Sequence, residues 1–184
     1  AQFHEWLAGS ALLHLKTVKS SVKTVFTTHA TMLGRTLASA DVNLYAELDN
    51  IDPQKEAFDR GIQAKFLMEK VCAEKTDVFT TVSEITGIEA EKLLGRKPDV
   101  LLFNGLDMAK FPSFEEVSIK HKLFKNKMKQ FLLYYFFPYY SFDLENALIY
   151  FIAGRYEFHD KGIDIFINAL GKLNEILKEE KSNQ

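Results

Sequence analysis

Residues 147–162 read ALIYFIAGRYEFHDKG, and this stretch gives the strongest indication of the fold. Its first half is a continuous apolar run of β-branched and aromatic residues that ends at Gly154. Such a run predicts a strand buried on both faces, as in a parallel sheet. Asp160 is then expected to cap a helix. The apolar side chains of that helix follow at Ile163, Phe166, Ile167, Leu170 and Leu173.

Two cations lie just beyond the expected strand, Arg155 directly after Gly154 and Lys161 six residues later. Open α/β sheets bind ligands beyond the carboxyl ends of their strands, and a helix N-terminus favours an anion there. The spacing therefore indicates a diphosphate site held by Arg155 and Lys161. The alternative is that both side chains are ordinary solvated loop charges.

Composition limits the classes of protein to which the chain can belong. Its 184 residues suffice for one domain, or for one domain and part of another. The net charge of −2 provides no basic field that would attract nucleic acid or an anionic membrane. Cys72 is the only cysteine, which excludes an internal disulfide and fits a reducing compartment. No apolar run approaches the roughly 20 residues of a membrane-spanning helix. Because Ala1 already opens an amphipathic pattern, we expect a piece of a longer protein.

Helical spacings alternate along the chain with short β-branched runs. The expected helices cover residues 2–19, 33–38, 53–75, 84–94, 114–137 and the residues after 162. The expected strands cover residues 22–27, 77–82, 99–103 and 147–153, and residues 40–52 are expected to form a loop. Asp52, Ser83 and Ser113 are expected helix caps, and Phe58 and Phe66 should point inward. This alternation predicts an α/β fold with a Rossmann-like parallel sheet and flanking helices.

The rhythm of strands and helices is interrupted between Asn104 and Asn146 by one long helix. The helix carries a run of lysines at positions 120, 122, 125, 127 and 129, which we interpret as a solvated face. The aromatic cluster Phe131–Tyr140 is expected to be core or an interface, with a sugar-stacking surface as the alternative.

Several common catalytic motifs are missing from the sequence. It contains no Gly-x-Gly-x-x-Gly, no phosphate-binding Gly-x-x-x-x-Gly-Lys-Ser/Thr and no Gly-x-Ser-x-Gly. His4-Glu5 has no second histidine at zinc-binding spacing, and one cysteine cannot build a thiolate site. We therefore expect neither a metal nor a cofactor.

Six blocks of sequence, in order along nearly the whole chain, point to one family. They are FHEWLAG at 3–9, VFTTHATMLGR at 25–35, VFTTVSEITGIEA at 78–90, RKPD at 96–99, NGL at 104–106 and FIAGRYE at 151–157. Together they resemble the glycogen synthases of the animal and fungal type. The resemblance implies a GT-B fold, in which two Rossmann-like domains face each other across a cleft. Residues 1–140 would be the later part of the N-terminal domain, including a long helical insertion. Residues 141–184 would be the first strand–helix unit of the C-terminal nucleotide-binding domain.

The resemblance also implies an activity. The family transfers glucose from UDP-glucose to the non-reducing end of an α-1,4-glucan, with retention at the anomeric carbon. By that resemblance Arg155 and Lys161 would hold the UDP diphosphate, and Arg35 would add a third cation from the facing domain. His29 would contact the donor glucose as a catalytic residue. The family also implies a cytoplasmic homo-oligomer with no nucleic-acid or membrane partner.

Further assignments concern the acceptor side and the cleft loop. His4, Glu5 and Trp6 resemble a segment near the glucan, and a core position is the alternative for Trp6. Asn104 and Gly105 would form a cleft loop, and Phe103 stands where the family usually has proline.

The chain lacks the family's glycine-rich donor loop, its pair of glutamates eight positions apart and its arginine cluster for glucose 6-phosphate. We therefore expect these 184 residues alone to be inactive. Two alternatives stay open: a related GT-B transferase with another nucleotide sugar, and a non-catalytic glucan-binding or assembly module.

Overall fold

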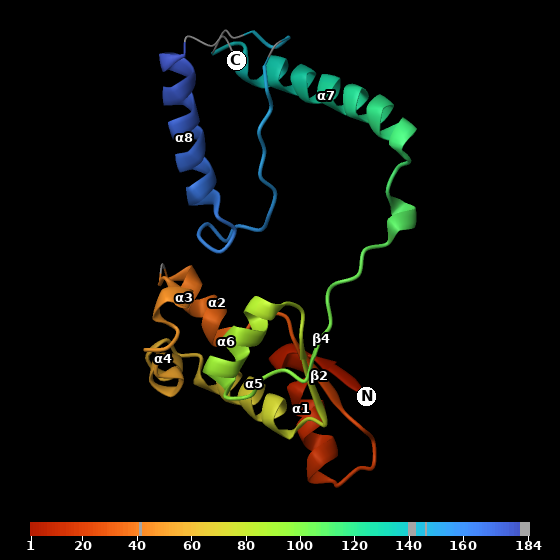
Figure 1. The fold of residues 1–184 in the computed structure, drawn as a ribbon, viewed down its shortest axis with the longest axis vertical. Helices are drawn as coiled ribbons and strands as arrows, with labels where there is room; N and C mark the ends of the chain where they lie inside the picture. Colours follow the sequence, from red (N-terminus) through yellow and green to blue (C-terminus); the bar gives the residue numbers. More distant parts are fainter. Residues whose placement is uncertain (41, 140–142, 146, 181–184) are drawn as a thin grey trace. The chain divides into compact units, whose positions relative to one another are not determined.

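The computed structural model describes residues 1–40, 42–139, 143–145 and 147–180, which form two compact units (Figure 1). The first unit comprises Ala1–Asn104 and Gly154–Asp164. The second comprises residues 105–153 and 165–180. The expected domain boundary at 140/141 and Tyr140 of the aromatic cluster lie outside the described residues.

A parallel sheet of four strands organises the first unit. Its strands are β1 (Gln2–His4), β2 (Val25–Thr28), β3 (Val78–Thr81) and β4 (Val100–Leu101), in the spatial order β1-β2-β3-β4. The expected α/β fold with a Rossmann-like parallel sheet is confirmed.

In the described residues, six helices follow or connect these strands. They are α1 (Glu5–Thr17), α2 (Met32–Ser39), α3 (Leu44–Glu47), α4 (Pro53–Asp59), α5 (Gln63–Lys75) and α6 (Glu84–Leu94). Because successive crossovers move in the same direction, right-handed connections bring the helices to one face. Accordingly, α1 packs on α5 and α5 packs on α6. The carboxyl ends of β1, β2 and β3 lead into α1, α2 and α6 at one edge of the sheet.

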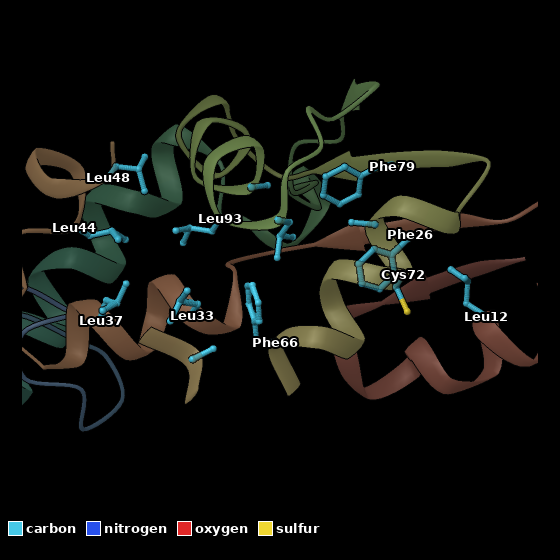
Figure 2. Close-up of a cluster of buried hydrophobic side chains, with 14 residues drawn as sticks. Leu12, Phe26, Leu33, Leu37, Leu44, Leu48, Phe66, Cys72, Phe79 and Leu93 are labelled. Carbon is cyan, nitrogen blue, oxygen red and sulfur yellow. The ribbon is translucent and has the colours of Figure 1, made fainter. Parts of the chain in front are cut away.

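The sequence Val-Phe-Thr-Thr occurs in both central strands and pairs in register. Phe26 and Phe79 stack with ring centroids 6.1 Å apart, and both rings are fully buried (Figure 2). Thr27 and Thr80 point to the other face, where their hydroxyl oxygens lie 2.7 Å apart. Both faces of the central strands are therefore buried: one face carries aromatic rings, and the other carries paired hydroxyl groups.

The N-terminal prediction was incomplete, because residues 2–19 are not one helix. Gln2–His4 form β1 and the helix starts only at Glu5, whose φ of 60° turns the chain sharply. A three-residue strand is too short for an alternating pattern to be recognised. The loop expected over residues 40–52 similarly contains the short helix α3.

The helix expected over residues 53–75 is broken into α4 and α5 at Gly61, which has a φ of 68°. The Gly61 and Ile62 N–H groups donate to the carbonyls of Phe58 and Ala57, which closes α4. The inward position of Phe66 is confirmed, but Phe58 is 67% exposed rather than inward. The caps at Asp52 and Ser83 form as expected.

The second unit contains the short 3₁₀ turn Met108–Lys110, α7 (Phe114–Phe136) and most of α8 (Ile163–Glu179). Residues 147–153 form neither a strand nor a helix, so the expected buried strand is wrong for this structure. Leu148, Tyr150 and Phe151 are exposed. The physical reason is the lack of a pairing partner, since the described residues of this unit include no other strand.

In the second unit, the helix ends and the exposed helix faces agree only partly with the sequence-based predictions. The Ser113 capping box of α7 forms as expected. The aromatic side chains described between Phe131 and Tyr139 are exposed, which does not fit a core role within this unit. Asp160 does not cap α8, because the helix begins only after Gly162, a residue with φ 65°. Within the described ranges, no helix is long and apolar enough to cross a membrane.

Candidate functional site

The first unit contains a pocket of about 380 Å³ that collects the three cations singled out from the sequence. Arg35 reaches it from the first turn of α2, and Arg155 and Lys161 from the segment before α8. The lining residues are Ala30, Gly34, Arg35, Ala38, Leu44, Tyr45, Glu89, Arg155, Glu157, His159, Asp160 and Lys161. Residues 120 positions apart in the sequence thus share one small cavity.

Arg35 owes its place to the way α2 begins. The Thr31 side chain caps the helix by accepting a hydrogen bond of 3.0 Å from the N–H of Gly34. Gly34 has no room for a side chain, because a Cβ there would lie 2.7 Å from Thr31 Oγ1 and closer still to Glu89 Oε1. This close packing of α2 against α6 fixes the turn from which the guanidinium projects.

The other two cations share one carboxylate. Arg155 Nη2 lies 3.0 Å from Glu157 Oε1, and Lys161 Nζ lies 3.8 Å from Glu157 Oε2. The aliphatic stem of Lys161 packs over Gly154, where a Cβ would lie only 3.3 Å from Lys161 Cγ. Arg155 and Lys161 are therefore neighbours around a single acidic group, and they are not splayed apart.

A hydrogen bond fastens this segment to α2. Ser39 Oγ donates to Asp160 Oδ2 at 2.6 Å, so the carboxylate that was expected to cap α8 joins the segment to α2 instead. Asp160 and Glu89 also line the pocket, where Asp160 accepts from Ser39 through Oδ2 and Glu89 accepts from the N–H of Thr31. Glu157 is thus the acidic side chain that lies directly between two of the cations.

A second cluster forms at the carboxyl ends of β1 and β2. His4 Nδ1 lies 3.0 Å from His29 Nε2, and the N–H of His29 donates to Glu5 Oε1 at 2.9 Å. The ring nitrogens at that distance require one imidazole to donate and the other to accept. His29 itself does not line the cation pocket, although the next residue, Ala30, does.

Two buried carboxylates lie beneath the turn between β2 and α2. Glu69 of α5 accepts from Thr28 Oγ1 at 2.6 Å and from the N–H of Met32 at 2.7 Å. Glu89 of α6 accepts from the N–H and the hydroxyl of Thr31, and from Tyr45 Oη at 3.3 Å. Burial raises the pKa of Glu69 to about 7, and burial together with Glu89 raises the pKa of Tyr45.

Sequence reasoning missed Glu69 and Glu89, although a signal was present. Each glutamate lies on the apolar face of its helix, among Phe66, Cys72 and Ala73 on α5 or Ala90 and Leu93 on α6. A carboxylate on such a face is rarely buried unless a partner holds it.

The weaker sequence candidates do not join the pocket. Trp6 is half-buried on α1, with Lys65 Nζ 5.3 Å from the centre of its ring. Asn104 and Gly105 are exposed and are not among the lining residues. In the residues that the structure describes, no group of three or more His, Cys, Asp or Glu side chains could hold a metal ion.

Comparison with known proteins gives one consistent family. The family model described as glycogen synthase matches residues 1–184. The chain is 48% identical over 183 residues to the liver glycogen [starch] synthase of Mus musculus, covering 100% of this chain and 26% of that protein. It is also 48% identical over 183 residues to glycogen [starch] synthase isoform 1 of Saccharomyces cerevisiae, covering 99% and 26%. The match to the Neurospora crassa glycogen [starch] synthase is 48% over 178 residues, covering 97% and 25%. The chain therefore spans about a quarter of the length of these relatives.

Proposed function

The chain belongs to the glycogen synthase family, and from this membership we propose that the protein is a retaining glycosyltransferase. It transfers glucose from UDP-glucose to the non-reducing end of an α-1,4-glucan. Its parts would be those of a GT-B enzyme, with residues 1–140 in the first domain and 141–184 in the second. The partners are UDP-glucose and glucan, and the intact protein works as a cytoplasmic homo-oligomer.

The pocket that holds Arg35, Arg155 and Lys161 carries this proposal. Three cations around one cavity of about 380 Å³ suit a compact dianion such as the diphosphate of a nucleotide sugar. Arginine offers paired N–H donors to phosphate oxygens, and lysine adds a mobile point charge. The Ser39–Asp160 hydrogen bond favours the arrangement by joining the two segments that bring these side chains.

The chemical task of the cations is to stabilise the leaving group. When the bond between glucose and UDP breaks, negative charge accumulates on the diphosphate. Fixed cations aimed at that charge lower the barrier, and such preorganised contacts contribute roughly 3 to 4 kcal/mol each in enzymes. Neither a metal nor a cofactor has a part in this proposal.

We assign the contact with the donor glucose to His29. Glu5 accepts a hydrogen bond from the His29 backbone, and His4 shares a hydrogen bond with the His29 ring. These two contacts hold the imidazole in position. A neutral imidazole in that position can exchange a hydrogen bond with a sugar hydroxyl. His4, Glu5 and Trp6 would lie on the acceptor side, and Asn104 with Gly105 would belong to the cleft loop.

Binding of UDP to this chain, measured by isothermal titration calorimetry, tests the proposal. Arg155→Ala and Lys161→Ala should each weaken binding at least ten-fold, which corresponds to about 1.4 kcal/mol. Lys97→Ala removes an equal charge from an exposed position of the same unit and should change nothing. Equal binding by all four proteins would refute the pocket as the diphosphate site. ADP as competitor separates UDP-glucose specificity from a related transferase with another nucleotide sugar.

A non-catalytic assembly or glucan-binding module stays the second candidate because of one observation. The aromatic side chains of Phe131, Tyr134 and Tyr135 on α7 are exposed, which is unusual for a surface that remains in water. Glucan binding without UDP binding would favour this second reading.

A further inference from the structure

Three carboxylates accept three of the four backbone N–H groups in the turn His29–Met32. Glu5 of α1 takes the N–H of His29 at 2.9 Å, and Glu89 of α6 takes that of Thr31 at 3.0 Å. Glu69 of α5 takes the N–H of Met32 at 2.7 Å. Three helices from distant parts of the sequence thus hold one short turn through side-chain oxygens.

This arrangement is costly for the fold. Glu69 is fully buried and Glu89 is 5% exposed, and burying a carboxylate costs several kcal/mol before its hydrogen bonds are counted. The charges that face Glu69 are Glu5 from α1 and Glu89 from α6, while Cys72 lies near it on its own helix. Burial disfavours the ionisation of Glu69 most, and the two glutamates add to that effect. The cap of α2 does not need these groups, since Thr31 caps it with a neutral hydroxyl.

The held turn carries one of the two proposed functional side chains and leads directly to the other. His29 is its first residue, and the N–H of Arg35 donates to the carbonyl of Thr31 at 3.0 Å, so Arg35 follows within one helical turn. Glu89 also lines the cation pocket and holds Tyr45 there. A shift of the turn would therefore move the imidazole and the guanidinium together.

We propose that Glu69 and Glu89 are positioning residues, which fix the turn between β2 and α2 and thereby set where Arg35 and His29 meet the nucleotide sugar. The inference rests on the function proposed above, because it takes the pocket to be the diphosphate site. It adds that the N–H groups of Thr31 and Met32, where α2 begins, are already occupied by the protein's own carboxylates. The diphosphate is accordingly held by the side chains of Arg35, Arg155 and Lys161.

Paired substitutions separate the hydrogen bonds from the charge. In Glu69→Gln the amide oxygen can still accept from Met32, and the amide N–H₂ can donate to Thr28 Oγ1. Glu89→Gln can likewise keep its contacts with Thr31 and Tyr45. Glu69→Leu and Glu89→Leu fill similar space but leave the turn without acceptors. Glu74→Leu, at an exposed position of the same α5, is the matched control.

UDP affinity and ¹⁵N NMR signals of the 184-residue chain provide two separate readouts. We expect each Leu variant to weaken UDP binding at least ten-fold, and to shift the Thr31 and Met32 amides and the Arg35 Nε–H. The Gln variants should bind within three-fold of the natural chain, and Glu74→Leu should match it. Thr28→Val, which removes one donor to Glu69 at nearly constant shape, serves as a milder variant should a Leu variant fail to fold. It is expected to show the same shifts in reduced form.

Different results would refute the two proposals separately. Leu variants that bind UDP like the natural chain, or Gln and Leu variants that lose affinity equally, would overturn the positioning role. If the natural chain itself does not bind UDP, the proposed diphosphate site is refuted. The positioning role is then decided by NMR: it stands where Arg35 and His29 signals move in the Leu variants only, and is overturned where they stay unchanged.

Discussion

Arg155 and Glu157 form an ion pair, with 3.0 Å between Nη2 and Oε1, at the edge of the pocket that Arg35 also lines. The second oxygen of the same carboxylate lies 3.8 Å from Lys161 Nζ. A carboxylate between two cations holds them close together, but it also competes with any phosphate that approaches them. The affinity of the pocket for a diphosphate thus depends on how readily Glu157 gives way.

We expect Glu157→Gln to bind UDP several-fold more tightly than the natural chain. The Arg155 side chain is 68% exposed, and ion pairs of this kind stabilise a fold by less than about 1 kcal/mol. Loss of the negative charge should consequently leave the thermal midpoint almost unchanged while removing a competitor for the cations. Calorimetric titration with UDP measures the effect, and Glu91→Gln on exposed α6 surface is the control. Weaker binding would mean that Glu157 orients the cations more than it competes for them.

Gly34→Ala should destabilise the chain by about 1 to 3 kcal/mol, the usual cost of overpacking. In an ordinary helix this change stabilises by up to about 1 kcal/mol, since alanine is the better helix former. At this position the new Cβ would meet Thr31 Oγ1 and Glu89 Oε1, and both atoms are fixed by hydrogen bonds. Gly171→Ala in α8 tests the rule, because a Cβ there meets nothing within 4 Å and should stabilise. Urea unfolding of the two variants should therefore shift in opposite directions.

The fold was predictable where the sequence pattern is local. The run at β3, the caps at Ser83 and Ser113, and the buried Phe66 follow from spacing and capping rules, whereas the strand expected at 22–27 begins only at Val25. The strand expected at 147–153 illustrates the limit. An apolar run records that a segment prefers burial, but it contains no information about whether a neighbouring strand is present to pair with it.

Of the residues that form the site, only the three cations could be predicted from the sequence. Arg155 and Lys161 stand at a recognisable place after an apolar run, and Arg35 stands in a block that resembles the family. The groups that hold them come from elsewhere in the chain. Glu69 and Glu89 are ordinary helix residues until the fold brings them under the turn at 28–32, and no spacing rule relates positions some 40 or 60 residues apart.

Stability should depend on pH through Glu69, whose pKa burial raises from 4.5 to about 7. Between those values the folded chain holds a proton that the unfolded chain has released, so this group's contribution falls as pH rises through the window and levels off about one unit above pH 7. The total loss across the window is about 3 kcal/mol. Urea unfolding at pH 5 and pH 8 should show most of this loss for the natural chain and none of it for Glu69→Gln.

Between pH 5 and pH 8, a second carboxyl group with a shifted pKa does not contribute to the change in stability. Hydrogen bonds from Lys16 and Thr24 hold the pKa of Asp77 below its ordinary value. Its stabilising effect is present above about pH 4 and is lost only in more acidic solution, so it is constant from pH 5 to pH 8. Parallel pH profiles for the natural chain and Glu69→Gln would contradict the assignment of the slope to Glu69.

Arg96→Lys should destabilise the first unit by about 1 to 3 kcal/mol, although the charge is kept. The guanidinium donates through Nη1 to the carbonyls of Ala73 and Thr76 at 2.6 and 3.0 Å, and through Nη2 to Asp99 Oδ2 at 2.7 Å. It thereby joins the end of α5 to the entry of β4, and one ammonium cannot reproduce so many directed bonds. Arg60→Lys, which changes one ion pair within α4's last turn, should cost less than about 0.5 kcal/mol. Urea unfolding compares the two variants, and equal losses would show that Arg96 acts only as a surface charge.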